Sequence, residues 1–126
     1  MDETTFRTYI GAFNAANYDA LVRYYADDVV FSFANGTTLR GRDEIVAFYR
    51  PLHAAIEETV EIQFIVMDDR HVAVELATEF RARKDYDAFP RGPLKAGDIV
   101  RVTSFVHYDI DGDGRFHRIR VGNFRP

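Results

Sequence analysis

Apolar residues follow a helical period in two parts of the first half of the chain. Within residues 4–26 and 43–52 they recur three, four and seven positions apart, which places them on one face of a helix. These stripes consist of Phe6, Tyr9, Ile10 and Phe13, then Tyr18, Leu21, Val22 and Tyr25, then Ile45, Phe48, Tyr49 and Leu52. Asn17 and Asp43 are residue types that cap helices, and Pro51 predicts a kink or an end. We expect two short helices before residue 27 and a third after Asp43.

The second half of the chain alternates apolar and polar residues, the pattern of half-buried strands. It predicts strands over residues 60–66, 71–83, 98–110 and 115–124, joined by turns at 68–70 and 111–114. An earlier strand at 29–34 precedes Asn35-Gly36, which predicts a hairpin with a type I′ turn. Residues 84–97 form the one long loop, and such loops are often functional. Helices followed by a meander of strands predict an α+β fold with an antiparallel sheet covered on one face.

Length and composition narrow the possible functions. The chain has 126 residues and no cysteine, which predicts one domain, residues 1–126, without thiolate chemistry. Its net charge of −4 argues against nucleic-acid binding, and no apolar run reaches the ~20 residues of a membrane span. We expect a cytoplasmic protein with no nucleic-acid or membrane partner. Its 11 phenylalanines and 7 tyrosines are many rings for a small core and indicate a lined cavity.

The four histidines show no spacing typical of metal ligands. No two lie four residues apart, and a hairpin closing near residue 112 pairs His107 with Arg118 and His117 with Tyr108. On this register no two histidines meet, so we expect no metal site, and nothing in the sequence indicates a cofactor. The charged residues around Glu57-Glu58 predict a solvated face.

The first half of the chain contains three recognisable segments: YDALV at 18–22, YYADDV at 24–29 and GRDEIVAFY at 41–49. Together they resemble the nuclear transport factor 2-like superfamily, most closely its SnoaL-like and ketosteroid-isomerase-like branch, over residues 4–124. The resemblance implies a curved antiparallel sheet wrapped around N-terminal helices, a cone with a ligand cavity inside. It also implies a homodimer formed through the outer face of the sheet.

Ketosteroid isomerase offers a residue-by-residue comparison. The resemblance places its oxyanion tyrosine on Tyr9 and the two tyrosines that network with it on Tyr25 and Tyr49. Its general base falls on Phe33 and its second oxyanion donor on Ser104. A positioned base contributes about 10²–10⁴-fold to rate and an oxyanion donor about 10²–10³-fold, so these two departures predict that steroid isomerisation is lost.

Strand alternation predicts which residues line the cavity. If Ser104 points inward, the inward set is Leu76, Thr78, Phe80, Val100, Val102, Ser104, Val106, Tyr108, His117, Ile119, Val121 and Asn123. This set contains no Asp, Glu or Lys, so it suits a small, mostly apolar or aromatic molecule. The candidate ligand-binding residues are Tyr9, Tyr25, Phe33, Tyr49, Thr78, Ser104 and Asn123.

Three functions fit this sequence. The first is small-molecule binding without a catalytic carboxylate. The second is an isomerase, cyclase or dehydratase whose acid or base is Asp85, Asp87 or Arg91 in the long loop, or His53. The third is a structural or protein-binding dimer with a vestigial cavity. The expected dimer face carries both charge signs and consists of Glu75, Ala77, Glu79, Arg81, Arg101, Thr103, Phe105, Arg118 and Arg120.

Overall fold

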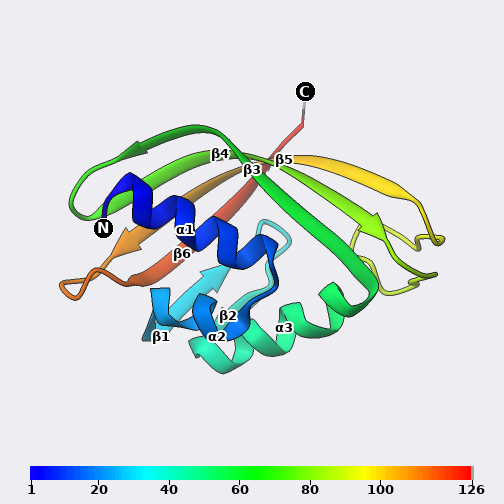
Figure 1. Ribbon diagram of the computed structural model, residues 1–126, viewed down its shortest axis with the longest axis horizontal. Helices are drawn as coiled ribbons and strands as arrows, with labels where there is room; N and C mark the ends of the chain where they lie inside the picture. The colour runs from blue at the N-terminus through cyan, green and yellow to red at the C-terminus, as the bar shows by residue number, and fades with distance from the viewer. Residues whose placement is uncertain (126) are drawn as a thin grey trace.

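A computed structural model describes residues 1–125 and shows an α+β fold built on one curved, six-stranded sheet (Figure 1). The elements are α1 (Glu3–Asn14), α2 (Tyr18–Leu21), the 3₁₀ turn η1 (Val22–Tyr24), β1 (Tyr25–Ser32), β2 (Thr38–Arg40), α3 (Gly41–Ala55), β3 (Ile56–Met67), β4 (His71–Ala82), β5 (Ile99–Ile110) and β6 (Phe116–Phe124). The predicted fold class is confirmed. No helix within residues 1–125 is long and apolar enough to cross a membrane.

The sheet is mixed rather than fully antiparallel. Its strand order is β2-β1-β6-β5-β4-β3, and β1 pairs with β6 in parallel, whereas every other neighbouring pair is antiparallel. The prediction of an antiparallel sheet was therefore wrong at this one pair. The strands of the β3–β6 meander follow one another along the chain and pair with their sequence neighbours, but β1 and β6 meet across most of the chain, and no local pattern fixes their relative direction.

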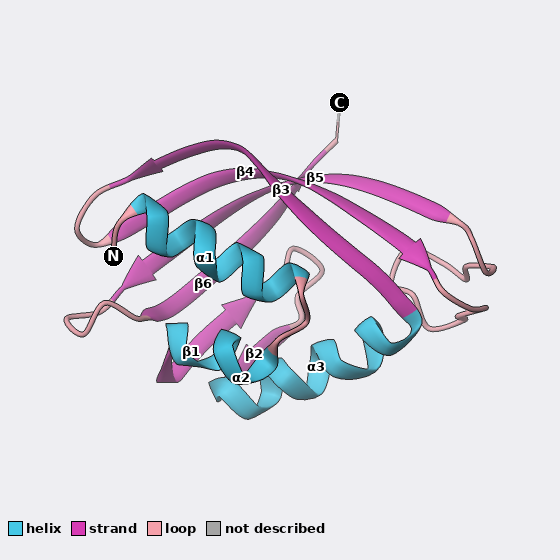
Figure 2. Cartoon of the chain, viewed as in Figure 1, coloured by secondary structure: helices cyan, strands magenta, loops and turns pink. Residues whose placement is uncertain are grey.

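The helices lie on the concave side of the sheet. Figure 2 shows α1 within the arch formed by the long strands, and α3 beside β1 and β2. The predicted stripe of α1 is buried, and the Asp2 side chain caps the helix by accepting a hydrogen bond from the Thr5 amide at 2.8 Å. Burial of this aromatic stripe against the sheet makes one side of the cavity.

Two predicted helices differ from the structure at their ends. Asn17 caps a single turn, as its side chain accepts from the Ala20 amide, but the chain then passes through η1, and Tyr25 begins β1 rather than ending a helix. The third helix begins at Gly41, before Asp43, and continues through Pro51 to Ala55. Propensity signals place such ends only approximately, because tertiary packing decides how far a helix extends.

The first hairpin forms where predicted but with a different turn. Phe33 donates to the Thr37 carbonyl at 2.9 Å, which closes a loop of three residues. A type I′ turn needs a positive φ at both central residues. Gly36 has a φ of 90°, but the φ of Asn35 is not positive, so the type I′ prediction was wrong. Asn35 instead accepts a hydrogen bond from the Thr37 amide at 3.0 Å.

In the last hairpin, residues of β5 pair with residues of β6 that lie two positions later in the chain than predicted. His107 lies opposite Arg120, and a register shift follows Asp109, so that Ile110 pairs with Phe116. The extra residue reverses the alternation at the start of β6: Phe116 is fully buried and His117 is exposed, contrary to the predicted inward His117. The other predicted inward positions of β5 and β6 keep their side, because the two-residue shift leaves their parity unchanged.

Candidate functional site

A cavity of about 340 Å³ lies between the concave face of the sheet and helices α1 and α3. Aromatic and aliphatic side chains make most of its wall, among them Ile10, Phe13, Phe31, Phe48, Leu76 and Val106. Phe33 stacks on Phe31 with ring centroids 4.8 Å apart, so an apolar ring occupies the position that the resemblance gives to a general base. Among the residues that line the cavity, rings and aliphatic side chains therefore outnumber polar side chains.

Six of the seven candidate ligand-binding residues line this cavity: Tyr9, Phe33, Tyr49, Thr78, Ser104 and Asn123. The seventh, Tyr25, is fully buried behind Tyr9, and their hydroxyl oxygens lie 3.1 Å apart. Its backbone carbonyl accepts two hydrogen bonds from the Arg42 guanidinium, at 2.8 and 2.6 Å, which hold the start of β1 against α3. Contact between these six side chains and a ligand stays a prediction.

The buried tyrosines form a different group from the one that the resemblance implies. Tyr9 pairs with Tyr25, and Tyr108 packs edge-on against Tyr9 with centroids 5.9 Å apart. Tyr49 instead lies among Phe13, Phe33 and His53.

Burial raises the pKa of the phenols of Tyr9, Tyr25, Tyr49 and Tyr108 well above the usual value, and the charge of Glu58 adds to this effect at Tyr49. They remain protonated near neutral pH and can donate hydrogen bonds.

One polar pair spans neighbouring strands in the cavity wall. Ser104 and Asn123 are directly opposite each other in the β5–β6 register, and the Ser104 hydroxyl donates to Asn123 Oδ1 at 3.1 Å. Ser104 is buried and Asn123 is exposed. The pair therefore presents hydrogen-bonding groups from an otherwise apolar stretch of sheet.

A carboxylate that the sequence analysis missed also lines the cavity. Glu58 is only 10% exposed at its side chain, and its Oε1 lies 3.0 Å from His53 Nε2. His53 Nδ1 in turn lies 2.6 Å from the Tyr18 hydroxyl. Both contacts are satisfied when Tyr18 donates to Nδ1 and the Nε2–H donates to Glu58. The predictions of a solvated Glu57-Glu58 face and of a lining without carboxylates were wrong at Glu58.

The length of β3 explains this error. The strand begins at Ile56, four residues before its predicted start, so Ile56, Glu58 and Val60 share the inward face. Extending the alternation of Val60 and Ile62 back by one step reaches Glu58, and that signal was available in the sequence. Within residues 1–125, Glu58 Oε2 has no hydrogen-bond partner, and no side-chain nitrogen or oxygen is both buried and unpartnered, so this oxygen is accessible to water. Glu58 itself lines the cavity.

The long loop covers part of the cavity but does not bring its acidic residues there. Tyr86 and Leu94 pair across it, and Phe89 is buried against Phe80. Phe89, Pro90 and Arg91 line the cavity. Asp85 is exposed and accepts a hydrogen bond from the Ala96 amide at 2.9 Å, and Asp87 is exposed as well. Of the candidates for acid or base, Arg91 lies in the cavity wall, and His53 reaches it through Glu58.

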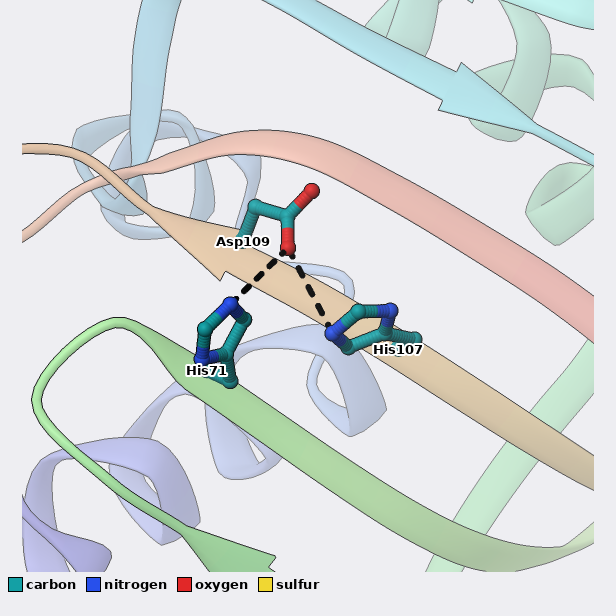
Figure 3. Close-up of side chains that lie close together, drawn as sticks. All are labelled: His71, His107 and Asp109. Atoms are coloured by element: carbon teal, nitrogen blue, oxygen red, sulfur yellow. Dashed lines mark ion pairs between the residues drawn. The ribbon is translucent and has the colours of Figure 1, made fainter.

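A second cluster lies on the opposite, convex face of the sheet (Figure 3). The rings of His71 and His107 stack with centroids 5.5 Å apart, and both approach Asp109. The prediction that no two histidines meet was therefore wrong. It considered only the β5–β6 hairpin, whereas the contact arises from β4–β5 pairing, which sets His71 opposite Asp109.

Comparison with known proteins agrees with this architecture. A model of the SnoaL-like domain matches residues 6–119. Among solved structures, a candidate polyketide cyclase from Xanthomonas campestris pv. campestris has 20% identity and a TM-score of 0.78, covering 92% of this chain and 84% of that chain. An epoxide hydrolase from Mycobacterium tuberculosis has 17% identity and a TM-score of 0.75, with coverage of 94% and 79%. No curated protein matches the chain.

The fold and its cavity define a cone-shaped α+β protein of the nuclear transport factor 2-like type, as the resemblance implied. Within that class, the chain belongs to the SnoaL-like domain family.

Proposed function

We propose that the protein binds a small, largely apolar molecule inside the cone. The cavity carries this proposal: its volume of about 340 Å³ lies in the range of ligand sites, about 300–1,000 Å³. Its walls are mostly rings and aliphatic groups, with a few polar atoms at separate points. Such a site gains affinity from apolar burial and orients the ligand by hydrogen bonds.

The polar groups indicate what the ligand carries. Glu58 Oε2 accepts hydrogen bonds, so we expect a ligand hydroxyl, amine or acidic C–H group on that side. The protonated Tyr49 phenol donates, so we expect a carbonyl or ether oxygen within its reach. The Ser104–Asn123 pair provides a further contact on β5 and β6. A ligand of this kind is a ring or short polyketide-like molecule bearing one or two oxygen functions.

A second candidate function is proton transfer on that same ligand. Glu58 supports it, because a carboxylate held by His53 and open to the cavity is placed to act as a general base. A proton beside a ligand carbonyl would pass to Oε2, and the negative charge left on the carbonyl oxygen would be stabilised by the Tyr49 phenol. The solved structures named as polyketide cyclases support this class by analogy of fold.

Binding can be tested by native mass spectrometry after incubation with a metabolite extract. We expect one added mass per chain, lost in Ser104→Phe, because the new ring fills the cavity. Thr103→Phe is the matched control: it is the preceding residue on β5 and faces the other side of the sheet. Equal retention of ligand by both variants would place binding elsewhere.

The catalytic candidate is tested separately with Glu58→Gln, which keeps an oxygen near His53 but cannot accept a proton as a base. Once a bound ligand has been identified, we expect the Glu58→Gln variant to convert it about 10²–10⁴-fold more slowly than the native chain. The affinity of the variant for this ligand should change only a few-fold. Unchanged conversion in Glu58→Gln would exclude Glu58 as the base. Loss of affinity with unchanged conversion of the ligand that remains bound would show that Glu58 only binds.

A further inference from the structure

We propose that His71, His107 and Asp109 form a binding site for a divalent transition-metal ion, with Zn²⁺ as the ion to test. The three residues each offer one ligand atom, and these atoms all lie within 4.8 Å of one another. Figure 3 shows both imidazole rings directed toward the same carboxylate oxygen. The site lies on the convex face, so it is separate from the cavity and independent of the function proposed there.

The distances between the three candidate ligand atoms are close to those of a metal site before any ion is bound. His71 Nε2 lies 3.8 Å from Asp109 Oδ1, and His107 Nε2 lies 3.4 Å from the same oxygen. Ligands about 2.0–2.1 Å from a tetrahedral Zn²⁺ stand roughly 3.3–3.4 Å from one another. Small side-chain rotations therefore bring the three atoms to coordination distance, and the fourth position remains open to water.

Paired strands, rather than a loop, hold these residues in place. His71 and Asp109 are direct partners in the β4–β5 register, and His107 lies two residues before Asp109 on the same face. Their Cα positions are fixed by the ladder of backbone hydrogen bonds. Sites built on strands keep their ligands closer to the required geometry than sites built on loops.

A second carboxylate orients one of the histidines. Asp68 lies at 3.0 and 3.2 Å from His71 Nδ1, through its two oxygens. Asp68 is itself held by the amides of Arg70 and His71, both at 2.8 Å. With its proton on Nδ1, His71 presents the lone pair of Nε2 to the ion. Metal-binding histidines almost always have such a partner on the other ring nitrogen.

One contact, between Arg120 and His107, opposes metal binding and provides a further test of the proposal. The Arg120 guanidinium donates to His107 Nδ1, which favours a proton on Nε2, the atom that would bind the ion. Arg120 is exposed, so it can turn into solvent when the ion binds. Its positive charge also repels a cation, and Arg120→Gln should therefore bind the ion more tightly than the native chain.

The donor set indicates the class of ion. Two imidazoles and one carboxylate suit Zn²⁺ and its neighbours among the first-row transition ions, whereas Mg²⁺ and Ca²⁺ prefer sites made of oxygen alone. We therefore expect Zn²⁺ and Co²⁺ to bind and Mg²⁺ not to compete with them.

The experiment uses the full chain, freed of metal with a chelator and then dialysed. Calorimetric titration with Zn²⁺ should give one site per chain, and Co²⁺ should give the visible absorption of a low-coordinate nitrogen and oxygen site. We expect His71→Ala, His107→Ala and Asp109→Ala each to weaken binding at least ~100-fold. Asp68→Asn should weaken it about 10–100-fold, as loss of an orienting partner does.

His117→Ala is the matched control, because His117 is an exposed strand histidine outside the cluster. It should bind Zn²⁺ as the native chain does, and thermal unfolding should show that every variant remains folded. The proposal is overturned if the native chain binds no Zn²⁺. It is also overturned if His71→Ala and His117→Ala bind equally, or if Mg²⁺ displaces Zn²⁺. None of these results bears on ligand binding in the cavity.

Discussion

The two faces of the sheet are made from the same strands but differ in burial, polarity and charge. On β5, Ser104, Val106 and Tyr108 face the cavity and are buried. Between them, Phe105 and His107 face outward, and Phe105 is 47% exposed. Strand alternation thus lets one strand build an apolar cavity and a charged, histidine-bearing surface at once, and each face can be changed without changing the other.

Polar groups are paired on both faces, but for different reasons. On the concave side a buried polar group gives up water, and a protein partner offsets this loss: Tyr9 bonds Tyr25, and Glu58 bonds His53. On the convex side, Glu79 pairs with Arg101 at 3.2 Å in contact with solvent. Exposed pairs of this kind contribute only about 0–1 kcal/mol. The difference predicts that equal substitutions have unequal effects on the two faces.

The largest expected contrast lies on β6. Phe116 is fully buried and Phe124 is 51% exposed. We expect Phe116→Ala to lower the free energy of unfolding by about 3–5 kcal/mol, and Phe124→Ala by less than about 1 kcal/mol, since most surface changes are small. Denaturant unfolding of both variants measures this. Equal losses would contradict the assignment of the two faces.

The next contrast compares two neighbouring glutamates on β3. Glu58 faces the cavity and bonds His53, whereas Glu57 is exposed. Glu58→Ala leaves the buried His53 Nε2 without its partner, and we expect a loss of about 1–3 kcal/mol in unfolding free energy. Glu57→Ala should stay within about 0.5 kcal/mol of the native chain. A stable Glu58→Ala variant would show that water replaces the carboxylate.

These two positions also show how far sequence reasoning extends. Periodicity located the stripes of α1 and α3, the meander and most cavity-facing positions, because residues buried on one face recur at the period of the helix or strand. It misplaced Glu58, since a charged residue beside Glu57 looks like surface until the strand is known to begin at Ile56. It also missed the contact of His71 with His107, because pairing between β4 and β5 depends on register across a long loop.

The convex face leads to a third prediction, that two copies of the chain associate through it. Besides charged residues, this face exposes Phe64, at 60%, and Phe105. Exposed rings of this size favour a protein interface. We expect a dimer at micromolar concentration by light scattering, and Phe105→Asp to raise its dissociation constant at least ~10-fold. A monomer at all concentrations would remove this proposal without affecting the cavity.

The smallest expected effect concerns the hydroxyl pair of the concave side. Tyr25→Phe removes the hydrogen bond between Tyr25 and Tyr9, and we expect it to cost about 0.5–1.5 kcal/mol at neutral pH. Burial raises the pKa of Tyr25 in the folded chain above its unfolded value near 10. The unfolded chain therefore releases this proton first, so stability is intact below about pH 10 and falls as the pH rises toward the raised folded pKa. Tyr25→Phe removes one such proton, and its stability should fall with pH less steeply than that of the native chain, by about 1.4 kcal/mol per pH unit. Urea unfolding over an alkaline pH series measures this slope, and an unchanged slope would mean that Tyr25 ionises equally in the folded and unfolded chains.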